Sequence, residues 1–230
     1  MKVLFGGGVA EMRGSQAGTT ASRNRGGAYM RQRVTPTNPN STRQQSVRNN
    51  MTELTTAWSN DLTQAQRDAW TAFANAWPIT DVFGASIVLT GLQYYVKTNT
   101  VLLQAGELRL DDAPADQNVE SLTVVSATAD VSDALIELAF TPDPLGANSV
   151  LQVFATPAIS PGISFVKNKL RLIASITAAA TSPQDVTAAW LAVFGTFPVA
   201  GQKIVLQARV MSDINGVVST PLSASAIVTA

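Results

Sequence analysis

Hydrophobic and polar positions follow three patterns along the chain, and each pattern predicts a different kind of structure. Over residues 41–59 and 63–77, large side chains recur at intervals of four, three and four, which is one face of an α-helix. After residue 119 the chain becomes a series of short β-rich runs separated by Pro, Gly and Asp. Residues 1–28 show neither pattern, because glycine, serine and threonine dominate there.

The first two predicted helices form a helical hairpin. Asn40 or Ser41 suits the N-cap of the first helix, Thr63 suits that of the second, and Pro78 ends the second. We expect the aromatic side chains of this hairpin to pack between its helices or against a third element. The positions that share a face are Val47, Met51, Leu54 and Trp58 in the first helix and Gln66, Trp70, Phe73 and Trp77 in the second.

A third helix is predicted after a short strand pair or loop at residues 80–91, in which Ile87, Val88 and Leu89 are expected to be buried. Gly106 stands where a C′ glycine would end this helix. The helix has one stripe of mostly apolar residues, formed by Leu92, Tyr95, Val96, Asn99, Leu102 and Leu103.

The C-terminal part of the chain predicts six or seven strands, the number found in a β-sandwich. Asn215-Gly216 lies between two of these runs and is a strong signal for a hairpin turn. Residues 182–195 interrupt the series with a helical pattern, which we interpret as a crossover between the two sheets. The polar, proline-bearing segment 110–119 precedes the series and reads as a linker.

The predicted fold class is therefore α+β, in four consecutive parts. Residues 1–40 form an extended Arg/Gly-rich arm, and residues 41–109 form a small three-helix region. Residues 110–119 link this region to an immunoglobulin-like or fibronectin-type β-sandwich at 120–230.

Charge is unevenly distributed, although the 16 basic and 16 acidic residues of the chain cancel. Residues 1–48 hold eight basic residues and one acid, Glu11, so this part has a net charge of +7 and the remainder −7. Such asymmetry predicts an arm that binds an acidic surface or a nucleic acid, or that lies on the acidic body of its own protein. The candidate partner-binding residues are Arg13, Arg23, Arg25, Tyr29, Arg31, Arg33 and Arg43.

Part of the arm carries a strand pattern. Tyr29, Arg31 and Arg33 alternate with Met30 and Val34, so the tyrosine and the two arginines are expected to share one face of a strand. Arginine is suited to two-pronged binding of carboxylate or phosphate groups. One aromatic ring among the arginines is too few for a base-reading platform, so we do not expect nucleic acid as the main partner.

The sequence predicts no catalytic, metal-binding or cofactor-binding residues. Cysteine and histidine do not occur, which removes thiolate nucleophiles, the usual zinc ligands and the commonest general base. Asp111, Asp112 and Asp116 lack the spacing of a calcium loop. A membrane span needs about 20 consecutive apolar residues and a secretory signal about 7 to 15, and we find neither pattern.

Residues 20–106 resemble a segment of structural proteins from tailed bacteriophages. The resemblance rests on three motifs in order: the Arg/Gly-rich stretch "SRNRGGAYMRQR", then "NPNSTRQQSVR", then "LTQAQRDAW". "TGLQYYVKTN" is similar to the next element of that pattern. The segment "VLQARVMSDINGVVSTPLSASAIV" resembles the last hairpin of the immunoglobulin-like or fibronectin-type modules that phages append to virion proteins.

This resemblance implies a virion structural protein, made in the host cytoplasm and placed on the capsid surface rather than the tail. The implied role is a capsid decoration or cement protein, whose arm staples neighbouring major capsid subunits while the β domain projects outward. Alternatives are a tail or head-tail connector protein, a nucleic-acid-binding protein, and an adhesion module that binds host-surface glycans through the β domain. The implied partners are the major capsid protein or other virion proteins, with self-association as a further option.

Overall fold

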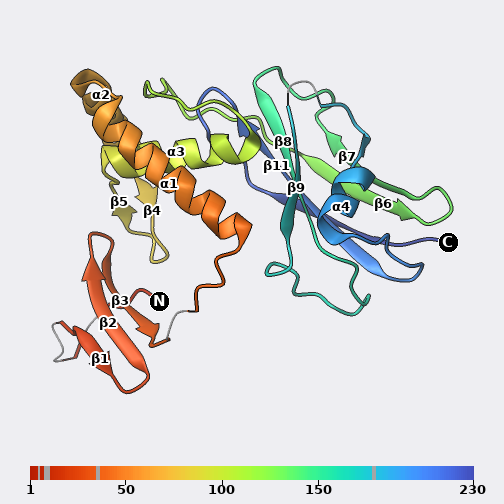
Figure 1. Ribbon diagram of the computed structural model, residues 1–230, viewed down its shortest axis with the longest axis horizontal. Coiled ribbons are helices and arrows are strands. Elements are labelled where there is room, and N and C mark those ends of the chain that lie inside the picture. The colour runs from red at the N-terminus through yellow and green to blue at the C-terminus, as the bar shows by residue number, and fades with distance from the viewer. Residues whose placement is uncertain (5, 8–10, 35–36, 178–179) are drawn as a thin grey trace. The chain divides into compact units, whose positions relative to one another are not determined.

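The computed structural model describes residues 1–4, 6–7, 11–34, 37–177 and 180–230, and it contains both helices and largely antiparallel sheets (Figure 1). The chain divides into two compact units, Met1–Tyr94 and Tyr95–Ala230. The division falls inside helix α3 (Gly91–Ala105) rather than in the predicted linker 110–119. The described residues contain four helices, because α4 lies within the β domain in addition to the three predicted before it.

The N-terminal region contains a small sheet, so the expectation of an extended arm over residues 1–40 is wrong for its central part. Strands β1 (Gly14–Gln16), β2 (Thr19–Asn24) and β3 (Gly27–Gln32) form an antiparallel sheet in that order (Figure 1). Tight turns make this possible, because Ala17 and Gly27 have φ angles of 49° and 104°, which reverse the chain between strands. The parts of the predicted arm at 5, 8–10 and 35–36 lie outside the described residues.

The helical hairpin is confirmed, with α1 at Thr42–Asn60 and α2 at Gln64–Ala76. Ser41 and Thr63 cap them, each in a capping box that closes the first turn. Trp70 is fully buried, and the ring of Phe73 meets that of Tyr94 edge-on with centroids 5.2 Å apart. This contact places an aromatic side chain of α3 against the hairpin, as the sequence predicted.

The predicted apolar face of α1 is only half buried. Leu54 is fully buried and Trp58 is partly buried, whereas Val47 and Met51 are 45% and 48% exposed. The buried residues of α1 lie in its second half, so periodicity alone overestimated the length of the packed face. In α2 the expected face member Trp77 is the C-cap residue and is 42% exposed.

A two-stranded hairpin of β4 (Ile79–Thr80) and β5 (Ser86–Ile87) follows the helices. This confirms the predicted strand pair. The three following apolar residues differ from the expectation, because Ile87, Val88 and Leu89 are only partly buried. They line a cavity and do not form part of a closed core.

The C-terminal half of α3 belongs to the second unit because it packs there. Leu102 forms a buried apolar cluster with Val150 and Met211. The buried side-chain amide of Asn99 forms two hydrogen bonds with the backbone of Leu110. Its Nδ2 donates to the Leu110 carbonyl at 3.1 Å, and its Oδ1 accepts the Leu110 N–H at 2.7 Å. The beginning of the predicted linker is therefore fixed to the helix, which explains why the division lies inside α3.

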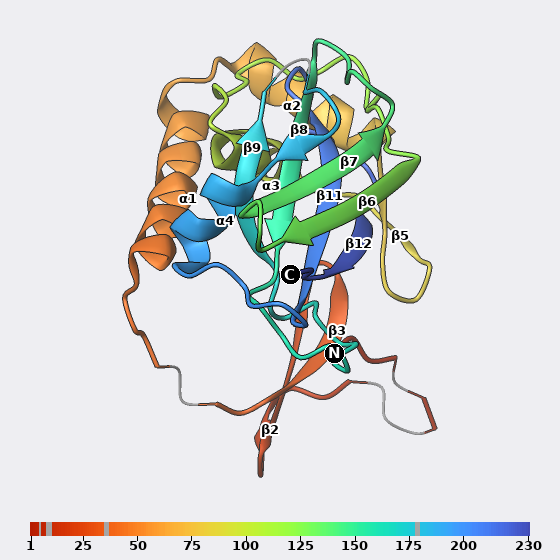
Figure 2. The same cartoon turned by 90° about the vertical axis from the view of Figure 1, so that its right-hand side faces the viewer.

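The β domain consists of two antiparallel sheets, which confirms the predicted β-rich region (Figure 2). One sheet has the order β10-β7-β6 and the other β12-β11-β8-β9, and Figure 2 shows β6 and β7 lying across β8 and β11. The strands are β6 (Val124–Asp130), β7 (Leu135–Thr141), β8 (Ser149–Ala155), β9 (Arg171–Ile176), β10 (Gln184–Asp185), β11 (Lys203–Ser212) and β12 (Leu222–Ile227). Alternate apolar residues of both sheets, such as Leu138, Val153 and Leu206, form one shared core.

Helix α4 (Thr187–Phe194) connects β10 of one sheet with β11 of the other, as the helical pattern at 182–195 predicted. Its Trp190 enters the shared core and is 1% exposed. The indole Nε1 donates to the carbonyl of Thr156 at 3.0 Å, so its polar atom is satisfied in the interior.

Asn215-Gly216 forms the predicted turn between β11 and β12. The Gly216 N–H donates to the Ser212 carbonyl at 2.9 Å, and the Val217 N–H donates to Asn215 Oδ1 at 2.9 Å. Gly216 has a φ of 63°, and a Cβ placed there would lie 2.7 Å from Thr98 Cγ2 and 3.0 Å from the Thr98 carbonyl oxygen. This turn therefore packs directly against α3, and glycine is required for both conformation and space.

We predict that Gly216→Ala lowers the unfolding free energy of the chain by about 2 kcal/mol, since it adds overpacking to a left-handed backbone. Urea denaturation followed by intrinsic fluorescence measures the change. Gly162→Ala is the matched control, because a Cβ at Gly162 meets nothing within 4 Å. Equal stabilities of the two variants would contradict the packing described for the turn.

Asp130 joins the end of β6 to the chain end after β12. Its Oδ1 accepts the Ser132 hydroxyl at 2.6 Å and its Oδ2 accepts the Thr229 hydroxyl at 2.8 Å. These two hydrogen bonds, with additional backbone amides, lower the pKa of Asp130 to about 2 from an ordinary 3.8. The carboxylate thus helps to hold the two sheets together at one edge, where Asp130 also pairs with Thr229.

Because the folded pKa of Asp130 lies below the unfolded one, its contribution to stability is complete above about pH 4 and is lost as the pH falls towards 2. We predict that Asp130→Asn lowers the urea midpoint at pH 7 and that the difference from the wild type disappears near pH 2. Asp133→Asn, an exposed neighbour, is the control. A constant difference between wild type and Asp130→Asn over this pH range would contradict the assignment.

Candidate partner-binding surface

The register of the N-terminal sheet determines which candidate residues share a face. Tyr29 pairs with Ser22, and Arg31 pairs with Thr20. Because directly paired residues of antiparallel strands point to the same side, these four side chains lie on one face, here called the Tyr29 face. Met30 pairs with Ala21 on the opposite face, as the alternation in the sequence predicted.

Two candidate arginines are engaged by the one acid of this region. Arg13 Nη2 lies 2.9 Å from Glu11 Oε1, and Arg23 Nη1 lies 3.7 Å from the same oxygen. The hydrogen bond from Arg13, together with the nearby charge of Arg23, lowers the pKa of Glu11. By strand parity Arg23 is on the face of Met30, so it does not belong to the Tyr29 face.

The other four candidate arginines are exposed, and the described residues give none of them an acidic partner. Arg31 lies in β3, Arg33 directly follows β3, and Arg25 lies in the turn between β2 and β3. Arg43 differs, because it belongs to the first turn of α1 and not to the sheet. Arg31, Arg33 and Tyr29 are therefore the residues that the fold brings together.

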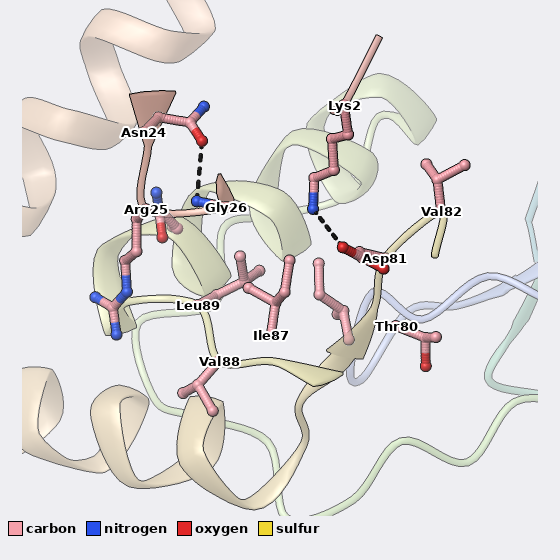
Figure 3. Close-up of a pocket in the computed structure, with 12 residues that line it drawn as sticks. Lys2, Asn24, Arg25, Gly26, Thr80, Asp81, Val82, Ile87, Val88 and Leu89 are labelled. Atoms are coloured by element: carbon pink, nitrogen blue, oxygen red, sulfur yellow. Dashed lines mark hydrogen bonds and ion pairs between the residues drawn. The ribbon is translucent and has the colours of Figure 1, made fainter. Parts of the chain in front are cut away.

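The N-terminus adds a short extended segment to the other edge of β3. The Met30 N–H donates to the Met1 carbonyl at 2.8 Å, and the Val3 N–H donates to the Ala28 carbonyl at 2.9 Å. Lys2 is thereby placed opposite Tyr29 and its Nζ reaches Asp81 Oδ2 at 2.8 Å (Figure 3). This ion pair ties the N-terminal sheet to the β4–β5 hairpin.

Asp81 is held in position by the turn that it closes. Its Oδ1 accepts the N–H groups of Phe83 at 2.7 Å and Ala85 at 2.9 Å. The hydrogen bond from Lys2 is the main cause that lowers the pKa of Asp81, and the two backbone amides act in the same direction against the opposing effect of desolvation. The sequence does not predict this ion pair, although Asp81 and Gly84 together carry a turn signal.

A cavity of about 350 Å³ lies beside the ion pair (Figure 3). Its walls come from Lys2 and the β2–β3 turn on one side and from the β4–β5 hairpin on the other. Figure 3 shows the side chains of Ile87 and Leu89 between Arg25 and the Lys2–Asp81 pair. The apolar part of its lining comprises Ile79, Val82, Ile87, Val88 and Leu89.

Acidic residues outside this region form no comparable arrangement. Within the described ranges, no group of three or more Asp or Glu side chains is placed to hold a metal ion. Arg109 Nε donates to Asp111 Oδ1 at 2.7 Å, so Asp111 of the predicted linker is part of an ion pair. Across the described part of the chain, no helix is long and apolar enough to cross a membrane.

A comparison with solved structures finds a likeness to the crystal structure of a Fn3-like protein from Clostridium thermocellum. The sequences are 23% identical, and the match covers 52% of this chain and 97% of that chain with a TM-score of 0.31. No protein-family model matches the chain, and no curated protein matches it.

We predict that Lys2→Met raises the pKa of Asp81 towards 3.8, because the variant removes the largest cause of its depression. An NMR titration of the Asp81 side-chain carboxyl measures the change. Arg33→Met is the control, since it removes an exposed cation of the same region that makes no contact with Asp81. An unchanged Asp81 titration in Lys2→Met would show that the ion pair does not form in solution.

Proposed function

We propose that this chain is a non-enzymatic structural protein of a tailed-phage virion, a capsid decoration protein that binds neighbouring capsid subunits through its N-terminal sheet. The observation that carries the proposal is the pair of exposed arginines, Arg31 and Arg33, on and beside β3, next to the partly buried ring of Tyr29. Arginine guanidinium groups without an acid of their own are suited to carboxylates on a partner. The resemblance of residues 20–106 to phage structural proteins suggests that this partner is another protein of the virion.

A preformed sheet supports docking better than an unstructured arm would. Ordering an extended segment costs about 1 to 2 kcal/mol per residue in backbone entropy. Residues 14–32 already have this order in the free chain, so binding does not have to supply it. Many identical copies on a shell would add avidity to a modest contact at each site.

The β domain is proposed to be a fibronectin type III-like module that projects from the particle. The support is the strand order: β10-β7-β6 in one sheet and β12-β11-β8-β9 in the other is the arrangement of such sandwiches.

The described residues of the second unit carry exposed cations at Lys167 and Arg171, which provide a control for the effect of charge on binding.

We predict that Arg31→Ala/Arg33→Ala weakens co-sedimentation with shells assembled from the major capsid protein of its own phage by at least tenfold. Each arginine is expected to make a charge-assisted contact worth about 1 to 2 kcal/mol. Lys167→Ala/Arg171→Ala is the matched control, because it removes the same number of exposed charges from the second unit and should bind as the wild type does.

Other outcomes separate the alternatives. Equal weakening of shell binding by both double variants would show that binding depends only on the net charge of the chain. This result would contradict a defined binding surface. Tight binding to DNA with a steep salt dependence, and none to shells, would favour a nucleic-acid-binding protein. Binding to isolated tails in place of shells would assign the chain to the tail or connector, and glycan binding with no binding to shells would assign it to adhesion.

A further inference from the structure

The cavity beside the Lys2–Asp81 pair has an apolar lining that is open to solvent. Ile87, Val88 and Leu89 are partly buried and line it, with Ile79 from the neighbouring strand. Apolar side chains that are partly buried normally pack against other side chains. Here they face a space large enough for one or two aliphatic side chains of another molecule.

The backbone next to this lining is also unpaired. Val88 and Leu89 continue the chain from β5, which pairs with β4 on one side. Among the described residues, no backbone hydrogen bond reaches the N–H or C=O groups of Val88 and Leu89. Because Ile87 directs its N–H and C=O groups to Ile79 of β4, the groups of Val88 point to the other edge, which is the edge that an added strand requires.

Charge at the rim selects among possible partners. Lys2 is neutralised by Asp81, whereas Arg25 is exposed and has no acidic partner among the described residues. The rim therefore presents one uncompensated positive charge above an apolar lining (Figure 3). A carboxylate on the ligand would complement it.

We infer that this cavity binds an extended peptide segment of a partner protein by strand addition at Val88, on the edge of β5 that faces away from β4. The segment places an aliphatic side chain in the cavity and an acidic side chain against Arg25. The inference deepens the proposed function, because it supplies a second contact with the capsid partner and rests on that function for the identity of the partner. The contact uses Arg25 and the β4–β5 hairpin, whereas the proposed function rests on Arg31 and Arg33, so different variants test the two.

The test titrates the full-length chain with three blocked heptapeptides and follows backbone amide signals by NMR. The probes share the sequence Thr-Val-Thr-Val-Thr-X-Thr, with Asp, Asn or Lys at X. We expect the Asp peptide to shift the amide signals of Val88 and Leu89 and to bind at least tenfold more tightly than the Lys peptide. Arg25→Ala should abolish this preference, whereas Arg33→Ala should retain it.

A fourth probe tests strand addition itself, because N-methylation of alternate peptide bonds in the Asp peptide removes the donors that would pair with the backbone at Val88. This probe should bind at least tenfold more weakly. Equal affinity for the Asp and Lys peptides, an unchanged preference in Arg25→Ala, or no shift with any peptide would overturn the inference. If Arg31→Ala/Arg33→Ala still lost shell binding in that case, the proposed function would be retained without this second contact.

Discussion

The antiparallel pairing of β2 with β3 is the constraint on which the candidate surface depends. Six residue pairs, from Thr19 opposite Gln32 to Asn24 opposite Gly27, fix the register. A slip of one residue would move Tyr29 and Arg31 to the opposite face, where Ala21 and Met30 now lie. The hydrogen bonds of Met1 and Val3 to β3, and the ion pair of Lys2 with Asp81, hold the same strand from its other edge.

Much of the fold could be predicted from the sequence because local signals agreed with tertiary packing. Ser41 and Thr63 capped their helices, Gly106 ended α3 with a φ of 88°, and Asn215-Gly216 formed its turn. Each of these signals depends on the conformation of a few adjacent residues, which the sequence records directly. The alternation around Tyr29 was predictable for the same reason.

The errors concern contacts between segments that are distant in the chain. Glycine density in residues 1–28 indicated an arm, yet glycine also serves tight turns, and the pairing of β1, β2 and β3 decided the outcome. The exposure of Val47 and Met51 depends on how far the packed part of the helical hairpin extends, which periodicity does not contain. The contact of Lys2 with Asp81 spans 79 positions and carries no local signal.

The central claim is that the N-terminal sheet exists in the free protein and presents its arginines before any partner binds. Amide hydrogen exchange of the isolated full-length chain tests this claim most directly. The account predicts that Met30, whose N–H donates to the Met1 carbonyl, and Arg33, whose N–H donates to the Gly18 carbonyl, exchange much more slowly than an unstructured peptide. Exchange at the rate of an unstructured chain at both positions would contradict it.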